Sequence, residues 1–336
     1  CILGAAVPAG EGLCHESVAG TSGEGIRSLF GEPLWIMPSP IVLVAGGANI
    51  DVKVVSSQET AQGISTPGRI HVCAGGVARN IAEALARLGA KARLLTAVGD
   101  DPWGTWVVAQ TAGAGVETKD VLRRGEQTGF YVTVDGRGIA DTTIIEATPF
   151  EDWQRAPVED AALLVLDANL AEPVMAALAR RARRLALVGT SPAKVRRLRL
   201  LLDRAWLVCL TIAEARALMN EDAAGVTLAR KVQALGPICV LLTEGARGLG
   251  LVAEEGTNGE WFTEAAYPAS VVDPTGAGDT AAAVVMLGLL RSRAPARLLP
   301  LAAQAAALTV STWGNVHPGV GTILGAGEDD DSTGAV

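Results

Sequence analysis

The sequence has 336 residues, of which 49% are hydrophobic and 19% are charged. This is enough apolar material for one large α/β domain or two modest ones, and it excludes disorder over most of the chain. There are 28 Lys and Arg residues against 36 Asp and Glu residues, a net charge of −8, which argues against a nucleic-acid partner. The longest nearly unbroken apolar stretch, residues 280–290, is shorter than the roughly 20 residues of a membrane helix, so we expect no membrane partner.

The cysteines indicate the cellular compartment, and the composition of the two ends of the chain indicates whether they are ordered. Five scattered cysteines form no Cys-x-x-Cys pair, which is typical of reduced thiols in a cytoplasmic protein and unlike a zinc site. Because the first residue is Cys1, we expect the sequence to begin within a longer or processed chain. Residues 1–40 are expected to form a poorly ordered extension, and residues 325–336 an acidic disordered tail.

From Ile41 onward, short apolar runs alternate with amphipathic stretches. The runs predict strands at residues 41–45, 94–98, 163–166, 185–188, 206–209 and 238–242. The amphipathic or apolar stretches predict helices at residues 77–88, 173–183, 193–203, 223–235 and 281–290. Strands and helices that alternate in this way indicate an α/β fold over residues 41–324, with a central, mostly parallel sheet flanked by helices.

Two segments interrupt this alternation, at about residues 52–72 and 128–146. Both hold strand-like residues, and Gly136 with Gly138 suggests a hairpin turn. We expect a small β-element that acts as a lid over the carboxyl ends of the strands.

The most informative segment is residues 273–280 (DPTGAGDT), which precedes an apolar helix. Its glycines would let several backbone N–H groups converge at the helix start, where free donors and the helix dipole bind phosphate. Asp279 would lie beside this anion hole and take a proton from an attacking hydroxyl. The alternative is that Asp279 only caps the helix. The predicted anion hole consists of Thr275, Gly276, Ala277 and Gly278.

Two further groups of residues are candidates for binding a polyhydroxylated substrate. Gly75 and Gly76 precede a helix and allow a ligand to approach the backbone, while Asn80 lies off the apolar stripe of that helix. Asn49 and Asp51 follow the first strand, where a carboxylate can accept hydrogen bonds from vicinal hydroxyls. Plain turns with surface Asn and Asp side chains are the alternative interpretation.

Two weaker signals lie later in the chain. Thr243, Gly245 and Gly248 follow a predicted strand and could hold nucleotide phosphates or ribose, although a plain turn explains them as well. Glu214 follows another strand, and such a glutamate is more often a solvated helix residue than a ligand.

Taken in order, these segments resemble the ribokinase-like (PfkB) family of carbohydrate and nucleoside kinases over about residues 41–321. Both family signatures are recognisable, one in residues 75–99 with Asn80 and one in residues 273–280. The likeness is greatest to the members that phosphorylate pseudouridine, and it lies in residues 48–52, 67–70, 75–82 and 167–170.

The resemblance implies ATP-dependent phosphorylation of a nucleoside 5′-hydroxyl, pseudouridine first, with Asp279 as the base. It implies ATP and Mg²⁺ as cofactors, adds a monovalent cation as a further candidate, and suggests a homodimer through the lid. A kinase for ribose or a purine nucleoside, and a kinase-like binding protein with weakened catalysis, are the alternatives. The implied nucleoside site is Asn49, Asp51, Gly75, Gly76, Asn80 and Asn169. The implied ATP site is Thr243, Gly245 and Gly248 with Asn315 near the adenine, and Glu214 would hold the metal through water.

The sequence departs from the family pattern in two places. The usual Asn-x-x-Glu motif reads Thr211-Ile212-Ala213-Glu214, which keeps the carboxylate and replaces the amide by a hydroxyl. This change predicts weaker use of magnesium. Residues 188–191 (VGTS) stand where an Asp-Pro pair is common.

Overall fold

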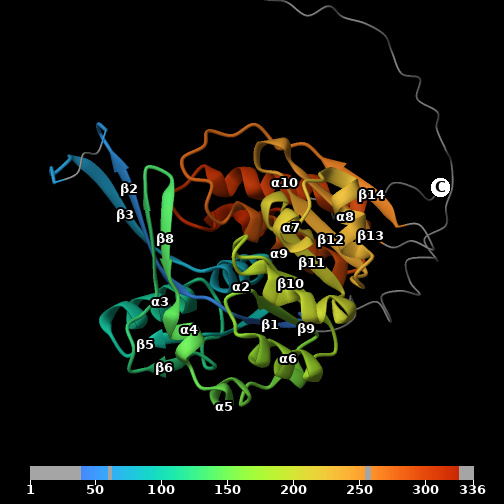
Figure 1. Cartoon of the computed structure of the whole chain (residues 1–336), viewed down its shortest axis with the longest axis horizontal. Helices are drawn as coiled ribbons and strands as arrows, with labels where there is room; N and C mark the ends of the chain where they lie inside the picture. Colours follow the sequence, from blue (N-terminus) through green and yellow to red (C-terminus); the bar gives the residue numbers. More distant parts are fainter. Residues whose placement is uncertain (1–38, 60–62, 254–258, 325–336) are drawn as a thin grey trace, which may run out of the picture.

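The structure is a computed structural model that describes residues 39–59, 63–253 and 259–324 (Figure 1). The predictions for the two ends of the chain therefore lie outside the described residues, except for Ser39 and Pro40.

The first half of the described chain contains two strands of the large sheet, further β-strands that form smaller sheets, and several helices. Its strands are β1 (Ile41–Ala45), β2 (Asn49–Ser56), β3 (Gly68–Gly75), β4 (Lys91–Leu95), β5 (Ala97–Gly99), β6 (Leu122–Arg124), β7 (Phe130–Val134) and β8 (Arg137–Asp141). Its helices are α2 (Val77–Arg87), α3 (Pro102–Gly113), α4 (Thr143–Ala147), α5 (Phe150–Trp153) and the 3₁₀ helix η2 (Val158–Asp160).

The second half alternates strands with helices, and after its last strand two long helices pack against each other. Its strands are β9 (Leu163–Asp167), β10 (Leu185–Val188), β11 (Leu207–Thr211), β12 (Cys239–Thr243), β13 (Leu249–Ala253) and β14 (Glu260–Glu264). Its α-helices are α6 (Glu172–Arg181), α7 (Ile212–Met219), α8 (Gly225–Gln233), α9 (Ala277–Leu290) and α10 (Pro295–Val310). Its 3₁₀ helices are η3 (Val195–Arg204), η4 (Gly245–Arg247) and η5 (Pro318–Thr322).

The large sheet has the strand order β14-β13-β12-β11-β10-β9-β1-β4 (Figure 1). Its strands pair in parallel from β4 to β12, and β13 and β14 are antiparallel additions at one edge. The predicted α/β fold with a mostly parallel sheet is thus confirmed. The order reverses at β1, since the chain returns to β4 on one side and to β9 on the other. Open α/β sheets bind ligands at the carboxyl ends of the strands beside such a reversal.

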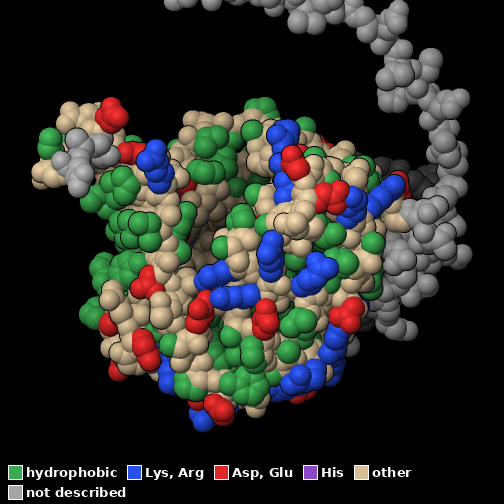
Figure 2. Space-filling view, in the orientation of Figure 1, with side chains coloured by type: hydrophobic (Ala, Val, Ile, Leu, Met, Phe, Trp, Pro, Cys, Tyr) green, Lys and Arg blue, Asp and Glu red, His purple; other side chains and the backbone are tan. Residues whose placement is uncertain are grey.

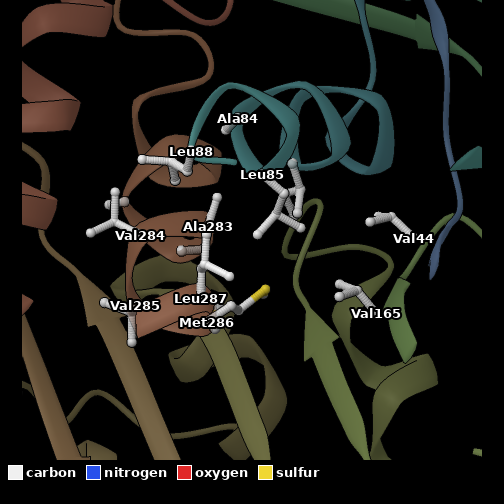
Figure 3. Packing of buried hydrophobic residues seen from close by; sticks show 14 of the residues in the cluster. Val44, Ala84, Leu85, Leu88, Val165, Ala283, Val284, Val285, Met286 and Leu287 are labelled. Atoms are coloured by element: carbon white, nitrogen blue, oxygen red, sulfur yellow. The ribbon is translucent and has the colours of Figure 1, made fainter. Parts of the chain in front are cut away.

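Alternation along the buried strands produces two hydrophobic cores, one on each face of the sheet. Val44 faces the core that contains α2, α9 and α10, whereas Leu43 faces the core that contains α6, η3, α7 and α8. In Figure 3, Leu85 of α2 and Leu287 of α9 lie in one cluster with Val44 and Val165 of the sheet. This packing holds the N-terminal ends of α2 and α9 close together.

A four-stranded sheet, β3-β2-β7-β8, stands off from the large sheet (Figure 1). We call it the lid sheet. Asp135 and Gly136 both have positive φ angles, 48° and 80°, and form the two-residue turn between β7 and β8. The predicted β-element is therefore present, while Gly138 lies in β8 opposite Thr133 and not in the turn.

Three predicted elements differ from the structure. The strand predicted at residues 94–98 is divided between β4 and β5, because Thr96 leaves the sheet and donates to the carbonyl oxygen of Gly46 at 2.6 Å. The helix predicted at residues 193–203 is the 3₁₀ helix η3, whose buried Val195, Leu198 and Leu201 recur every three residues. The second lid segment ends at Asp141, whose carboxylate accepts the N–H of Thr143 at 3.1 Å and begins helix α4.

No helix in the described ranges is long and apolar enough to cross a membrane.

Candidate active site

The carboxyl ends of the parallel strands border a cavity of about 530 Å³. Figure 2 shows the hollow between the lid sheet and the main body. Most of the residues predicted for the site line it, and they come from six different parts of the chain. These residues are Asn49, Asp51, Gly76, Asn80, Asn169, Glu214, Thr243, Thr275, Gly276, Gly278 and Asp279.

Asp279 lies in the first turn of α9, partly exposed to the cavity. The amide nitrogen of Asn80 in α2 donates to its Oδ2 at 2.8 Å. The pKa of Asp279 is raised to about 7, chiefly by burial and also by the negative charges of nearby carboxylates, while the hydrogen bond from Asn80 acts in the opposite direction. A carboxylate with this pKa can accept a proton near neutral pH, which is what a general base requires.

The turn before α9 is the one predicted to form the anion hole. Gly276 has a φ of 84°, and a Cβ at this position would lie 1.9 Å from the backbone oxygen of Asn315, so only glycine fits here. The carboxylate of Asp273 braces the turn, since its Oδ1 accepts the N–H and the hydroxyl of Thr275 at 3.0 and 2.8 Å. Gly278 opens onto the cavity, where a Cβ at this position would lie 3.8 Å from the hydroxyl of Thr243, whereas Ala277 does not line the cavity.

Asp51 carries the hydrogen-bonding groups predicted for sugar hydroxyls. Its Oδ1 accepts the amide of Asn49 at 2.6 Å, and its Oδ2 accepts the amide of Asn315 at 2.7 Å. Burial raises its pKa, and the hydrogen bond from Asn315 opposes that effect. A Cβ on Gly75 would lie 2.1 Å from Oδ1, so the glycine leaves room for the carboxylate without itself lining the cavity.

Asp167, at the end of β9, organises this part of the site, a role that the sequence analysis missed. Its carboxylate is fully buried and accepts the backbone N–H groups of Gly47, Ala78 and Asn169 at 2.8, 3.1 and 2.9 Å. Burial raises its pKa, and these backbone hydrogen bonds oppose that effect. Asp167 thus fixes the loop before Asn49 and the first turn of α2. An Asp at the end of an apolar run was the only signal available for it.

The end of the cavity near Asn169 is polar and carries a cation that the sequence analysis also missed. The ammonium group of Lys194 donates to the hydroxyl of Thr142 at 2.5 Å and to the Oδ1 of Asn169 at 3.1 Å. Lys194 is the only Lys or Arg among the described residues that line the cavity, and its other neighbour is Glu146 at 3.6 Å. Nothing in the spacing of residues 188–194 predicted that this lysine would reach the site.

Glu214 is buried, contrary to the solvated alternative. It forms a capping box with Thr211, in which its carboxylate accepts the Thr211 N–H at 2.8 Å and its own N–H is accepted by the Thr211 hydroxyl at 3.2 Å. Burial raises the pKa of Glu214, and hydrogen bonding of its carboxylate to Thr211 opposes the rise. A Cβ on Gly189 would lie 2.4 Å from this carboxylate, so the glycine in the unusual residues 188–191 leaves room for it.

The chemistry of the lining groups fits magnesium brought in by a nucleotide. Mg²⁺ prefers oxygen ligands and usually binds through one or two carboxylates, water and substrate phosphates. The cavity offers the carboxylates of Glu214 and Asp279, and no described group of three His, Cys, Asp or Glu residues forms a closed metal cage. Glu214 can therefore hold the ion through water.

Three residues predicted for the ATP site lie outside the cavity lining. Asn315 is 2% exposed, and its amide lies behind Asp51, where it donates to that carboxylate and to the carbonyl of Ala74. Its predicted place near the adenine is wrong, because both ends of its side chain are used within the protein. Gly245 and Gly248 form the turn between β12 and β13 with φ angles of 59° and 103°. Of that predicted set, only Thr243 reaches the cavity.

Comparison with known proteins places the chain in a kinase family. The sequence matches the pfkB family of carbohydrate kinases over residues 40–318. It is 38% identical to the pseudouridine kinase of Escherichia coli (strain K12) over 144 residues, which are 40% of this chain and 46% of that protein. It is 25% identical to the ribokinase of Bacillus subtilis (strain 168) over 285 residues, which are 81% of this chain and 94% of that protein.

The matched segments cover less than half the length of two curated E. coli kinases, the pseudouridine kinase and an uncharacterized sugar kinase. Among solved structures, a carbohydrate kinase from Agrobacterium tumefaciens superposes with a TM-score of 0.68 at 29% identity. The superposition covers 83% of this chain and 93% of that one.

Proposed function

Because the chain belongs to the pfkB family of carbohydrate kinases, we propose that it is an ATP-dependent kinase for the 5′-hydroxyl of a nucleoside, with pseudouridine as the acceptor. The observation that carries the proposal is the Asn80–Asp279 contact at the N-terminus of α9. There, a carboxylate whose pKa is about 7 and a Gly-rich helix start face the same cavity.

The proposed transfer needs one proton acceptor and a site for a negatively charged phosphoryl group. The acceptor oxygen attacks the γ-phosphorus, the bond from phosphorus to the β,γ-bridging oxygen breaks, and the hydroxyl proton passes to Asp279. Asn80 donates to Oδ2, which leaves Oδ1 to receive that proton. The backbone N–H groups at the start of α9 stabilise the charge on the transferred group. Mg²⁺ bound with the nucleotide supplies further charge neutralisation.

The two ends of the cavity support a nucleoside as the acceptor. Asn49 and Asp51 match a pair of ribose hydroxyls, and the groups of Thr142, Asn169 and Lys194 lie in the same cavity. An ammonium and an amide can bind the carbonyl and N–H groups of a pyrimidine base, which a free sugar lacks. The partial match to a pseudouridine kinase supports pseudouridine among the nucleosides.

Free ribose is the second candidate acceptor, supported by the match to 94% of a ribokinase. A panel of pseudouridine, uridine, adenosine, ribose and fructose 6-phosphate, with ADP formation measured for each, separates the candidates. We expect the highest kcat/KM with pseudouridine. A higher value with ribose or fructose 6-phosphate would overturn the nucleoside assignment, and no ADP with any acceptor would indicate a binding protein.

Lys194→Met tests the base-binding end separately. Loss of a hydrogen bond from a charged donor costs about 1.5–3 kcal/mol, so kcat/KM for pseudouridine should fall about 10- to 100-fold while that for ribose changes little. Lys231→Met is the matched control, because Lys231 is an exposed lysine paired with Glu221 outside the cavity. An equal loss with ribose would contradict a role in base recognition.

A further inference from the structure

Lys53 is a buried cation next to the site that the proposed reaction does not use. It lies two residues after Asp51 on the same face of β2, because side chains alternate along a strand. Its side chain is 3% exposed and does not line the cavity. The ammonium group instead donates to the carbonyl oxygen of Trp313 at 2.9 Å and to the Oδ1 of Asn315 at 2.6 Å, and it forms an ion pair with Asp273.

These three oxygens come from the two segments that enclose the anion hole. Asp273 holds the N–H and hydroxyl of Thr275, and the backbone oxygen of Asn315 lies against Gly276. The amide of Asn315 also donates to Asp51. Asp273 therefore links the ammonium group to the turn that is proposed to receive phosphate. Asn315 links it to the carboxylate of Asp51, which is proposed to bind the sugar.

The third oxygen, the carbonyl oxygen of Trp313, is also held in place by the surrounding chain. The ring of His71 in β3 stacks on the ring of Trp313 with 3.9 Å between centroids and 8° between planes. The lid sheet thus contributes both the ammonium group and a support for its carbonyl partner.

A carboxylate, an amide oxygen and a carbonyl oxygen are hard ligands of the kind that bind alkali and alkaline-earth cations. An ammonium group has three N–H donors, which matches in number the three oxygens around that of Lys53. The monovalent cation implied by the family resemblance does not fit at this position, because a side chain already occupies the oxygens that would hold it.

We propose that Lys53 is a built-in cation that replaces a free monovalent cation behind the anion hole, so that the enzyme needs no added potassium. The tethered charge stabilises the Asp273–Thr275 turn before nucleotide binds, and it also faces Asp51. This inference rests on the proposed kinase activity, but it does not depend on which acceptor is used.

The first test needs no variant. ADP formation by the parent protein is compared in potassium chloride and in tetramethylammonium chloride at equal ionic strength, with the best acceptor of the panel. We expect kcat and the KM for ATP to agree within about twofold. A parent enzyme that potassium activates about tenfold or more would overturn the proposal.

The second test removes the ammonium group with Lys53→Met, which leaves a cradle of three oxygens. We expect kcat in tetramethylammonium to fall about tenfold or more and to recover in part with potassium, whereas Lys91→Met, a change at an exposed lysine of β4, should behave like the parent. Loss of activity that potassium does not relieve at any concentration would contradict the built-in cation.

Thermal unfolding gives a readout that is independent of turnover. Potassium should raise the Tm of Lys53→Met relative to tetramethylammonium and leave the Tm of the parent unchanged. An unchanged Tm for the variant would count against a cation cradle. If no acceptor of the panel is phosphorylated, the proposed function fails while these melting curves still decide the role of Lys53.

Discussion

At the scale of single residues, the environment of Asp279 suits the proton acceptor that we propose. Its carboxylate lies where α2 and α9 pack together, and Asn80 is the partner that holds one of its oxygens. Burial raises its pKa to about 7, so that it changes protonation near neutral pH. A side chain that only capped the helix would have no need of this environment.

Asp279→Asn keeps the shape of the side chain and removes the proton acceptor. General-base losses are about 10² to 10⁴ in rate, so kcat should fall by at least that much, while the nucleoside Kd stays within about threefold. Steady-state kinetics and calorimetry check both values. The matched control is Asp203→Asn at an exposed position of η3. Turnover close to that of the parent would support helix capping and contradict the mechanism.

The pH dependence of the reaction follows from the same pKa. The base must be deprotonated, so kcat should fall about tenfold per pH unit below a midpoint near the value of about 7. Because Asn80 lowers the pKa of Asp279, Asn80→Ala should move this midpoint to higher pH. An acid limb that stays at the same pH in Asn80→Ala would contradict the assignment.

The raised pKa also predicts the sign of a stability change. Between the ordinary value of 3.8 and about 7, the folded protein keeps a proton on Asp279 that the unfolded chain has lost, so this residue's contribution to stability falls as pH rises. The Tm advantage of Asp279→Asn over the parent should therefore be larger at about pH 8 than at about pH 5. Melting curves at the two pH values measure it.

Thr211 tests the departure from the usual Asn-x-x-Glu motif. A hydroxyl is shorter than an amide and cannot donate and accept at the same reach. Thr211→Asn should therefore lower the magnesium concentration for half-maximal rate. Asn also caps helices well, so the Tm should change little. Thr211→Ser, which keeps the hydroxyl that caps α7, is the control. An unchanged or higher magnesium requirement in Thr211→Asn would refute the prediction.

At the scale of elements, the lid sheet has two different faces. The register pairs Asp51 with Tyr131 and Tyr131 with Ala140, and all three side chains line the cavity. The opposite face carries Val52, Val132 and Ile139, which the same register places side by side. One face can therefore cover a substrate, whereas the other packs against the core at Val52 and is exposed at Ile139.

We predict that the lid sheet closes over the nucleoside and excludes water, which would otherwise accept the phosphoryl group. Hydrogen exchange with and without nucleoside should show added protection in β2, β7 and β8. Strand β12, buried in the large sheet, is the internal control and should not change. Equal exchange in the lid strands with and without nucleoside would exclude closure.

At the scale of the whole molecule, the outer face of the lid sheet is exposed and apolar. Ile139 is 79% exposed and Ile70 is 65% exposed, and hydrophobic side chains gather over the lid sheet in Figure 2. Contiguous exposed apolar surface of this kind marks interaction sites. Since no charged residue of β2 shares this face within residues 50–54, a second copy of the same face is a matching partner.

We predict a homodimer through the outer faces of two lid sheets. Sedimentation or light scattering should give twice the chain mass for the parent and a single chain mass for Ile139→Asp. Leu200→Asp, at an exposed position of η3 away from the lid sheet, should leave the dimer intact. A parent that is monomeric at the concentrations of the kinetic assay would contradict this assembly.

Much of this organisation could be predicted from local patterns. Apolar runs such as residues 163–166 and 185–188 are buried on both faces, so they are strands whatever the details of the packing. Residues 273–280 combine a Gly-rich turn, a carboxylate and a helix start, and this combination favours a phosphate site over a plain turn. The class of fold, the β-element of the lid and the place of Asp279 follow from such patterns alone.

The sequence by itself thus determined the α/β class, the positions of the parallel strands and the position of Asp279 at the start of a helix. Each of these depends on residues that are close together in the chain. Only the tertiary structure decided which distant side chains meet: Asp51 with Asn315, Asn80 with Asp279, and Lys194 with Thr142. It placed Asn315 behind Asp51 and not at the expected ATP site, and it placed the ammonium group of Lys53 against the loops behind the predicted anion hole. These contacts depend on how helices and sheets pack over long sequence separations, and no local spacing records that packing.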